Sequence, residues 1–231
     1  MWGFAPDELL AIRLSLKVAL WATLGSLPLG VLTAYALARW RFRGKLLLDV
    51  LVHLPLVMPP VVTGYLLLLT FGRKGPLGGP LAEYLGIVFS FNWTGAALAS
   101  AVMAFPLLVR AMRLSFEAID RQLEEAAGTL GASRPWVFAT VTLPLAVPGV
   151  LAGMVLAYAK ALGEFGATIT FVSNIPGVTQ TLPSAIYTYT QVPGGELGAL
   201  RLTLVSITLS FVALVASELL ARPVARLVRG L

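Results

Sequence analysis

Few residues in this 231-residue chain could carry out enzymatic chemistry. The sequence has no cysteine and one histidine, His53, which lies close to Pro55. It contains no HExxH zinc motif, no GxxxxGK[ST] phosphate-binding loop and no plausible Ser/His/acid set. The absence of cysteine also excludes disulfides and thiolate metal sites. We therefore expect a non-catalytic chain without a metal or cofactor of its own, in which His53 packs within a helical bundle.

The densest group of carboxylates lies in a short polar segment in the middle of the chain. Residues 117–132 read EAIDRQLEEAAGTLGA, and their apolar side chains recur every three or four positions. This spacing predicts a short amphipathic helix. The apolar stripe consists of Ile119, Leu123, Ala126, Ala127 and Leu130, and the polar rim of Asp120, Arg121, Glu124 and Glu125.

Two interpretations of this helix follow from its pattern. It could lie on the membrane surface, but such helices favour Lys and Arg on the polar face, whereas this face is acidic. An acidic helix with small residues is better suited to a groove on a partner protein. Ser133 is a suitable N-cap and Pro135 fits a first helical turn, so a new helix is expected to begin directly after Gly131.

The surrounding sequence is that of an integral membrane protein. It is 58% hydrophobic and 12% charged, against about 25% charged residues in a typical soluble domain. Because a spanning helix needs about 20 mostly apolar residues, the apolar runs predict an all-α bundle of about five transmembrane helices. We expect one domain, 1–231, with spans at about 9–38, 47–72, 87–113, 135–161 and 198–221.

The basic residues orient these spans. Eleven of the 17 lie on one side, in the links after the first and third spans and in the carboxy tail with Arg222, Arg226 and Arg229. Excess Lys and Arg mark the cytoplasmic side, so the amino terminus is expected outside and the carboxy terminus and the 117–132 helix inside. The first residues do not resemble a cleaved signal peptide, and the basic residues form no stripe suited to nucleic acid.

Proline and glycine mark irregular backbone. Pro55, Pro59 and Pro60 should break or sharply kink the second span, and such irregular backbone usually lines a cavity. Residues 165–195 are free of charge but rich in Pro, Gly and Thr, which predicts an ordered loop rather than a sixth span. Gly149 and Gly153 form a small-xxx-small pair that would allow close helix packing.

The polar helix carries a recognisable spacing. Glu125-Ala126-Ala127, three residues, Gly131, nine residues, and then Val141-Thr142-Leu143-Pro144 resembles the EAA motif of ABC-importer permeases, with valine where the family often has isoleucine. In that family the motif forms a coupling helix that docks on a cytoplasmic ATPase. The resemblance implies ATPase coupling by Glu125, Ala126, Ala127, Leu130, Gly131, Leu143 and Pro144.

Longer segments are similar to the molybdate permease subunits of this family. They are residues 44–78, 104–120 and 162–202. Sulfate and thiosulfate permeases share much of the same layout and remain the alternative. Some members have an additional amino-terminal helix, for which this chain begins too late. The resemblance implies a type I permease fold in the inner membrane, a homodimer, two separate ATPase subunits and a periplasmic binding protein that delivers molybdate, or tungstate of nearly the same size and charge.

A dianion pathway is better lined by weak neutral donors than by fixed charge, and the spans have no charge near their centres. The alternative for each hydroxyl is a bond to its own helix backbone. Glu164 is expected to pair with Lys160 one turn away, in a structural or gating role. The pathway and gate candidates are Pro59, Pro60, Thr63, Tyr65, Glu164, Thr168, Thr170 and Asn174.

Two other classes of function are weaker. A secondary transporter or anion channel would be expected to show ionisable residues within the spans or an internal repeat, and neither is visible. A membrane-embedded enzyme lacks the motifs described above. Without a phosphate-binding loop the chain also needs a separate ATPase to drive transport.

Overall fold

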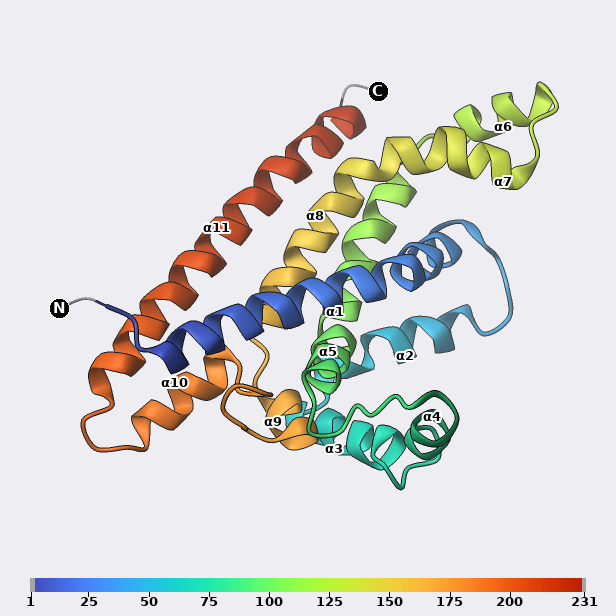
Figure 1. Ribbon diagram of the computed structural model, residues 1–231. Helices are drawn as coiled ribbons and strands as arrows, with labels where there is room; N and C mark the ends of the chain where they lie inside the picture. Colours follow the sequence, from blue (N-terminus) through green and yellow to red (C-terminus); the bar gives the residue numbers. More distant parts are fainter. Residues whose placement is uncertain (1–2, 230–231) are drawn as a thin grey trace.

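A bundle of long helices forms the frame of the molecule (Figure 1). The structure is a computed structural model that describes residues 3–229, with side chains described as far as residue 219. Helix α5 (Trp93–Ala118) lies at the centre and packs against α1 (Pro6–Arg39) and α8 (Leu143–Leu162). The last helix, α11 (Glu196–Arg229), packs mainly against α8. The side chains of Arg222, Arg226 and Arg229, used above for orientation, lie outside the described residues.

Close contact between α5 and α8 depends on the predicted pair of glycines. A Cβ atom on Gly149 would lie 2.2 Å from Cβ of Ser115, and one on Gly153 would lie 3.2 Å from the carbonyl oxygen of Leu108. No larger side chain fits at Gly149 without separating the helices. The small-xxx-small prediction is therefore confirmed.

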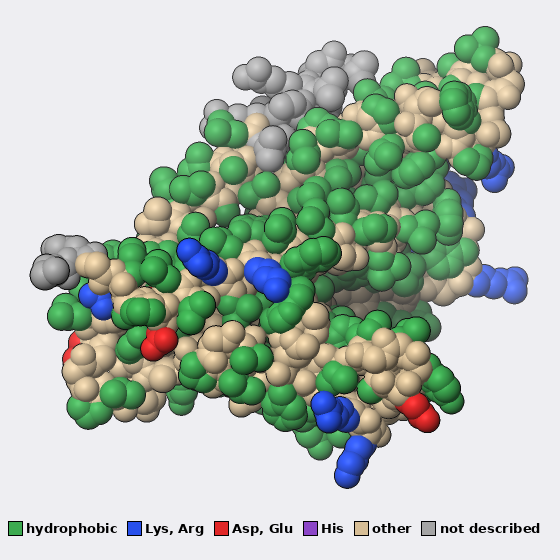
Figure 2. Space-filling view, in the orientation of Figure 1, with side chains coloured by type: hydrophobic (Ala, Val, Ile, Leu, Met, Phe, Trp, Pro, Cys, Tyr) green, Lys and Arg blue, Asp and Glu red, His purple; other side chains and the backbone are tan. Residues whose placement is uncertain are grey.

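The second span is broken where the prolines predicted a break. Helix α2 (Lys45–Val57) ends before Pro59, and α3 (Pro60–Phe71) continues at an angle of 114° to it. With 13 residues, α2 is only about 20 Å long, less than the thickness of a bilayer core. Four other helices in the described chain are long and apolar enough to cross a membrane, and the bent pair makes five if it counts as one span. Hydrophobic side chains cover most of the visible surface (Figure 2), as in a chain surrounded by lipid.

The charge-free segment 165–195 differs from the expected loop. It contains two short helices, α9 (Gly166–Val172) and α10 (Leu182–Thr190). Pro183 lies in the first turn of α10, where proline is tolerated. The threonine hydroxyls donate to carbonyls of their own helices, as Thr188 does to Ser184 and Thr170 to Gly166. The loop prediction holds only for the parts outside these helices, where Pro176 and Thr179 lie between α9 and α10 and Pro193 follows α10.

Four short elements complete the described chain. Helix α4 (Gly78–Leu85) follows α3 and precedes the link to α5. Helix α6 (Arg121–Thr129) follows α5, and α7 (Arg134–Val137) leads through a π-helical turn, η1 (Phe138–Thr142), into α8. In Figure 1, α6 and α7 lie at the opposite end of the bundle from α3, α9 and α10. The structure therefore separates the two groups of candidate residues.

Candidate functional site

The amphipathic helix is shorter than the sequence predicted. Residues 117 and 118 belong to the end of α5, and α6 begins only after Asp120. The carboxylate of Asp120 accepts a hydrogen bond of 2.9 Å from the backbone N–H of Gln122 and so caps the helix. This cap fixes the start of α6 at Arg121, four residues later than the predicted start at residue 117.

The expected docking face of α6 is open. No residue of this helix is buried, and Glu125 and Ala126 are exposed. Leu123 is half exposed, and Leu130, directly after the helix, is 89% exposed. Leucines exposed beside carboxylates at one end of the molecule form a surface suited to a partner protein.

Gly131 ends this segment by its backbone conformation. Its φ angle is +87°, in the left-handed region that favours glycine. Its N–H donates to the carbonyl of Gly128 at 3.0 Å, and the N–H of Ala132 donates to that of Ala127 at 3.2 Å. No atom lies within 4 Å of the position a Cβ would take. Glycine is therefore favoured here by the backbone conformation of the turn and not by a lack of space for a side chain.

The remaining residues of the motif lie at the start of α8. Leu143 is half buried and Pro144 is exposed in the first turn of that helix. The η1 turn before them contacts α6. The two halves of the motif are therefore linked through η1.

Sequence reasoning missed the inward role of Glu124, which it assigned to the polar rim. Its Oε1 accepts a hydrogen bond of 2.7 Å from the hydroxyl of Thr142 and lies 3.3 Å from Nη2 of Arg39. Successive helix residues are rotated by about 100°, so the two adjacent glutamates point in different directions, and here Glu125 is exposed while Glu124 is largely buried. No local pattern in the sequence identified the partners of Glu124.

The pathway candidates gather where α3 meets α9. Gly64 lies so close to Ala167 that a Cβ on the glycine would lie 2.4 Å from that residue's carbonyl oxygen. Thr63 is buried, and its hydroxyl has no hydrogen-bond partner among the described residues. Pro59, Pro60 and Tyr65 are exposed. The structure thus brings together two segments about 100 residues apart in the chain.

The hydroxyls on α9 are already engaged. Thr168 donates to the carbonyl of Phe165 at 2.9 Å, and Thr170 donates to that of Gly166 at 2.8 Å. Beyond α9, the amide nitrogen of Asn174 donates to the hydroxyl of Thr188 at 2.7 Å, while its Oδ1 is buried without a partner in the described chain. Among the candidate threonine hydroxyls of α3 and α9, that of Thr63 has no partner in the described chain.

Glu164 is paired as its spacing from Lys160 predicted. The two side chains are 2.9 Å apart, and the carboxylate is only 2% exposed. Its second oxygen accepts the N–H of Ala167 at 3.0 Å, which places negative charge at the amino end of α9, where it is favourable. The pair therefore presents no net charge to a passing anion.

His53 does not pack inside the bundle as expected. It lines an open pocket of about 450 Å³ between α2 and the last turns of α5, where Asp49, Arg113 and Glu117 contribute charged side chains. Its Nδ1 lies 3.2 Å from a carboxylate oxygen of Asp49, whose other oxygen accepts a hydrogen bond from Arg113. Arg113 also pairs with Glu117 at 2.8 Å. Because α2 is short, its first turns remain near the polar end of the molecule and carry these charges.

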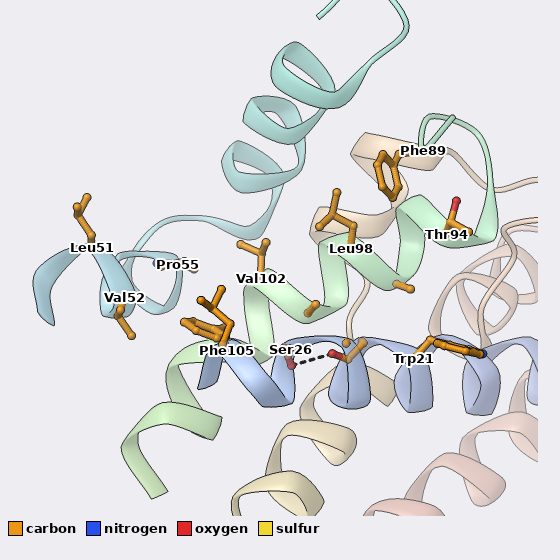
Figure 3. A pocket seen from close by; sticks show the side chains of 15 residues that line it. Trp21, Ser26, Leu51, Val52, Pro55, Phe89, Thr94, Leu98, Val102 and Phe105 are labelled. Atoms are coloured by element: carbon orange, nitrogen blue, oxygen red, sulfur yellow. Dashed lines mark hydrogen bonds between the residues drawn. The ribbon is translucent and has the colours of Figure 1, made fainter. Parts of the chain in front are cut away.

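An apolar cavity of about 560 Å³ lies between α1, α2 and α5 (Figure 3). Its lining includes Leu51 and Phe105, and its polar side-chain groups are the hydroxyls of Ser26 and Thr94 and the indole N–H of Trp21. The Ser26 hydroxyl already donates to the carbonyl of Ala22 at 2.8 Å. Such walls do not suit a doubly charged anion.

At the amino-terminal end of α1, a second buried carboxylate connects α1 to α11. Glu8 is fully buried and accepts a hydrogen bond of 2.7 Å from Arg201 of α11. Burial, and then the nearby charges of Glu8 and Asp7, raise the pKa of the Tyr189 phenol in α10. This tyrosine therefore stays neutral in the pH range of most cells.

Curated relatives match almost the whole chain. The molybdenum transport system permease protein ModB of Escherichia coli (strain K12) is 59% identical over 212 residues, which are 92% of this chain and 93% of the relative. The protein of the same name in Haemophilus influenzae is 57% identical over 215 residues, 93% of this chain and 94% of the relative. The sulfate transport system permease protein CysW of Synechococcus elongatus is 42% identical over 173 residues, 75% of this chain and 60% of the relative.

Solved structures share the fold at low sequence identity. A bacterial ABC transporter that imports the acidic polysaccharide alginate superposes with a TM-score of 0.71 at 16% identity, over 94% of this chain and 80% of that one. The same kind of transporter bound to its periplasmic protein gives a TM-score of 0.67 at 18% identity, over 97% and 80% of the two chains. Residues 26–226 also match the family described as binding-protein-dependent transport system inner membrane component. This chain therefore belongs to that family of ABC importer permeases, as a multi-pass protein of the inner membrane.

Proposed function

We propose that the chain is the permease subunit that carries molybdate, and with it tungstate, into the cytoplasm. The observation that carries the proposal is the 59% identity, over nearly the full length of both chains, to a permease named for molybdenum transport. The sulfate permease is less similar and is matched over a smaller part of its length. Sulfate is the second candidate substrate because that relative shares the fold and much of the sequence.

The exposed face of α6 supports docking on a separate ATPase. In this proposal the half-exposed Leu123 and the exposed Leu130 enter a groove on the ATPase, and Glu125 meets a basic group or a helix amino terminus there. Gly131 turns the chain away from the contact. Two permease copies then form one pore, two ATPases power it, and each coupling helix receives the movement that ATP binding produces.

The orientation proposed from the basic residues assigns the two ends of the bundle to opposite sides of the membrane. The contact between Arg39 and Glu124 joins the end of α1 to α6, so both would face the cytoplasm. The α3–α9 region lies at the opposite end (Figure 1), where a periplasmic binding protein would deliver the anion. The chain would then act as one transmembrane domain with its amino terminus outside and its carboxy terminus inside.

In the proposed pathway the anion meets neutral groups at the break between α2 and α3. Thr63 offers a hydroxyl without a partner among the described residues, and Pro59 and Pro60 leave irregular backbone beside it. Lys160 is neutralised by Glu164. Weak contacts allow a dianion to leave again, whereas an unpaired cation would hold it.

Reconstitution in proteoliposomes tests the function. The permease is combined with the ATPase and the binding protein, and ATP hydrolysis and uptake are measured with molybdate, tungstate or sulfate. We expect molybdate and tungstate to stimulate hydrolysis and to accumulate inside. Stimulation by sulfate alone would reject the substrate, and uptake without any ATPase would reject the ABC mechanism in favour of a secondary transporter or channel.

A further inference from the structure

Helix α6 makes little apolar contact with the rest of the chain. None of its residues is buried, and an open hollow of about 470 Å³ separates it from the end of α1. Tyr35, Trp40, Arg121 and Arg134 line this hollow. A helix held in this way can pass on a displacement through its links to α5, α7 and η1 and through the polar contacts that cross the hollow.

Glu124 makes those contacts. Its Oε1 lies 3.3 Å from Nη2 of Arg39, at the end of α1, and accepts a hydrogen bond of 2.7 Å from Thr142, at the end of η1. The same Nη2 donates to the backbone carbonyl of Ile119 at 2.8 Å. One carboxylate and one guanidinium thus connect α6, the end of α5, α1 and the entry to α8.

The surroundings make this connection stiff. The Arg39 side chain is 7% exposed and that of Glu124 18% exposed, so water screens the pair much less than a surface ion pair. Removing one partner leaves a largely buried charge uncompensated. Thr142 lies in a π-helical turn, a rare geometry that interrupts the regular ladder of helix hydrogen bonds and often occurs at functional positions.

We propose that Glu124 is a positioning residue that transmits the movement of α6 to α1 and α8. This inference rests on the proposed function, in which α6 docks on an ATPase. The two adjacent glutamates then have different tasks, because Glu125 lines the same hollow but is exposed and open to a partner, whereas Glu124 is paired with Arg39. Loss of Glu125 weakens docking, whereas loss of Glu124 leaves docking intact and separates ATP hydrolysis from transport.

The test compares Glu124→Gln with the matched variant Glu125→Gln in the reconstituted complex of permease, ATPase and binding protein. For Glu124→Gln we expect normal co-purification of the ATPase and normal basal hydrolysis, with stimulation by the loaded binding protein and uptake reduced about two- to thirtyfold. For Glu125→Gln we expect reduced co-purification. Equal loss of co-purification in both variants, or unchanged uptake in Glu124→Gln, would overturn the inference. If the unmodified complex shows no stimulated hydrolysis or does not assemble, the proposed function itself fails.

A spectroscopic readout separates transmission from simple stabilisation. Because the chain has no cysteine, Gln122→Cys on α6 and Arg41→Cys just after α1 can carry spin labels without background. We expect the distance between the labels within a subunit to be the same with and without ATP in the unmodified complex. In Glu124→Gln it should change with ATP, because α6 then moves without α1. If the distance between the labels does not change with ATP in either the unmodified complex or Glu124→Gln, the inference is overturned.

Reversal of the pair provides a rescue. Arg39→Glu combined with Glu124→Arg restores opposite charges across the hollow and should recover part of the stimulated hydrolysis lost in either single variant. A double variant no better than the worse single one would contradict a role for the ion pair.

Discussion

Gly166 of α9 lies directly against Pro60 of α3. A Cβ atom on Gly166 would lie 2.7 Å from Cβ of Pro60, and one on Gly64 would lie 2.4 Å from the carbonyl oxygen of Ala167. The two contacts are reciprocal, with a glycine of each helix facing the other. The break between α2 and α3 is therefore packed tightly against α9, the helix that follows α8.

Substitution of Gly64 tests this contact. In Gly64→Ala the new methyl group meets backbone oxygen, which cannot rotate away, so α3 and α9 must separate. We expect a loss of about 1–3 kcal/mol of stability, as for other overpacked contacts, and reduced uptake. Gly163→Ala is the control, because its Cβ would have no neighbour closer than 3.9 Å. Thermal unfolding in detergent measures both variants, and equal melting temperatures would contradict the tight contact.

The Lys160–Glu164 pair should respond unequally to loss of either partner. Lys160→Met leaves a carboxylate that is 2% exposed without a countercharge, whereas Glu164→Gln leaves a lysine whose side chain is 32% exposed and reaches water. Because a buried unpaired charge is costly, Lys160→Met should lower the melting temperature more than Glu164→Gln. The reverse order of melting temperatures would contradict this ranking, because glutamine can still accept the N–H of Ala167.

Gly131 should tolerate only residues that accept a positive φ. An alanine in the left-handed region costs about 1–2 kcal/mol, and asparagine costs less. We expect Gly131→Asn to retain uptake, and Gly131→Leu to insert normally in the membrane but to lose coupling. Gly128→Ala, within the helix and without neighbours, is the control and should not impair folding. Normal uptake by Gly131→Leu, measured in whole cells, would contradict the coupling role.

Reversal of the charge at Glu125 tests the docking face separately. Glu125→Lys should leave membrane insertion unchanged, because this side chain is exposed, but it should repel a basic site on the ATPase. Co-purification of the ATPase should fall, and uptake should fall with it. Full uptake by this variant would show that Glu125 takes no part in docking.

The α5–α8 contact can be broken and repaired. Gly149→Ala places a methyl group against Ser115 and should destabilise the protein by about 1–3 kcal/mol. Adding Ser115→Gly removes the opposing atoms and should restore most of the loss. Gly25→Ala, with no neighbour within 4 Å, should have little effect. No recovery in the double variant would mean that another contact limits the packing.

Local features were predictable from the sequence, and contacts between distant segments were not. Three prolines within six residues determine a break through their missing N–H groups, so the bend between α2 and α3 followed directly. The inward direction of Glu124 depends on its contact with Arg39, which lies 85 positions earlier. No local sequence pattern predicts a contact over that separation. The pocket around His53 was missed for a similar reason, because it needs charges from α2 and α5 together.

The threonine-rich segment shows a different limit. Its prolines and hydroxyls generally disfavour helices. Here, however, the hydroxyls of Thr170 and Thr188 donate to carbonyls of their own helices, and such bonds do not prevent a short helix that packs against other elements. Tertiary packing against α3, α5 and α11 decided the outcome there.

The exposure of Leu130 has a consequence for the life of the subunit in the cell. A copy synthesised without its partners would carry this leucine, and the half-exposed Leu123 beside it, into water on a helix with no buried residue. Such a segment opens easily and is readily recognised by proteases and chaperones. Orphan copies should therefore be degraded, and in the proposed assembly the amount of the ATPase partner would set how many of these subunits survive.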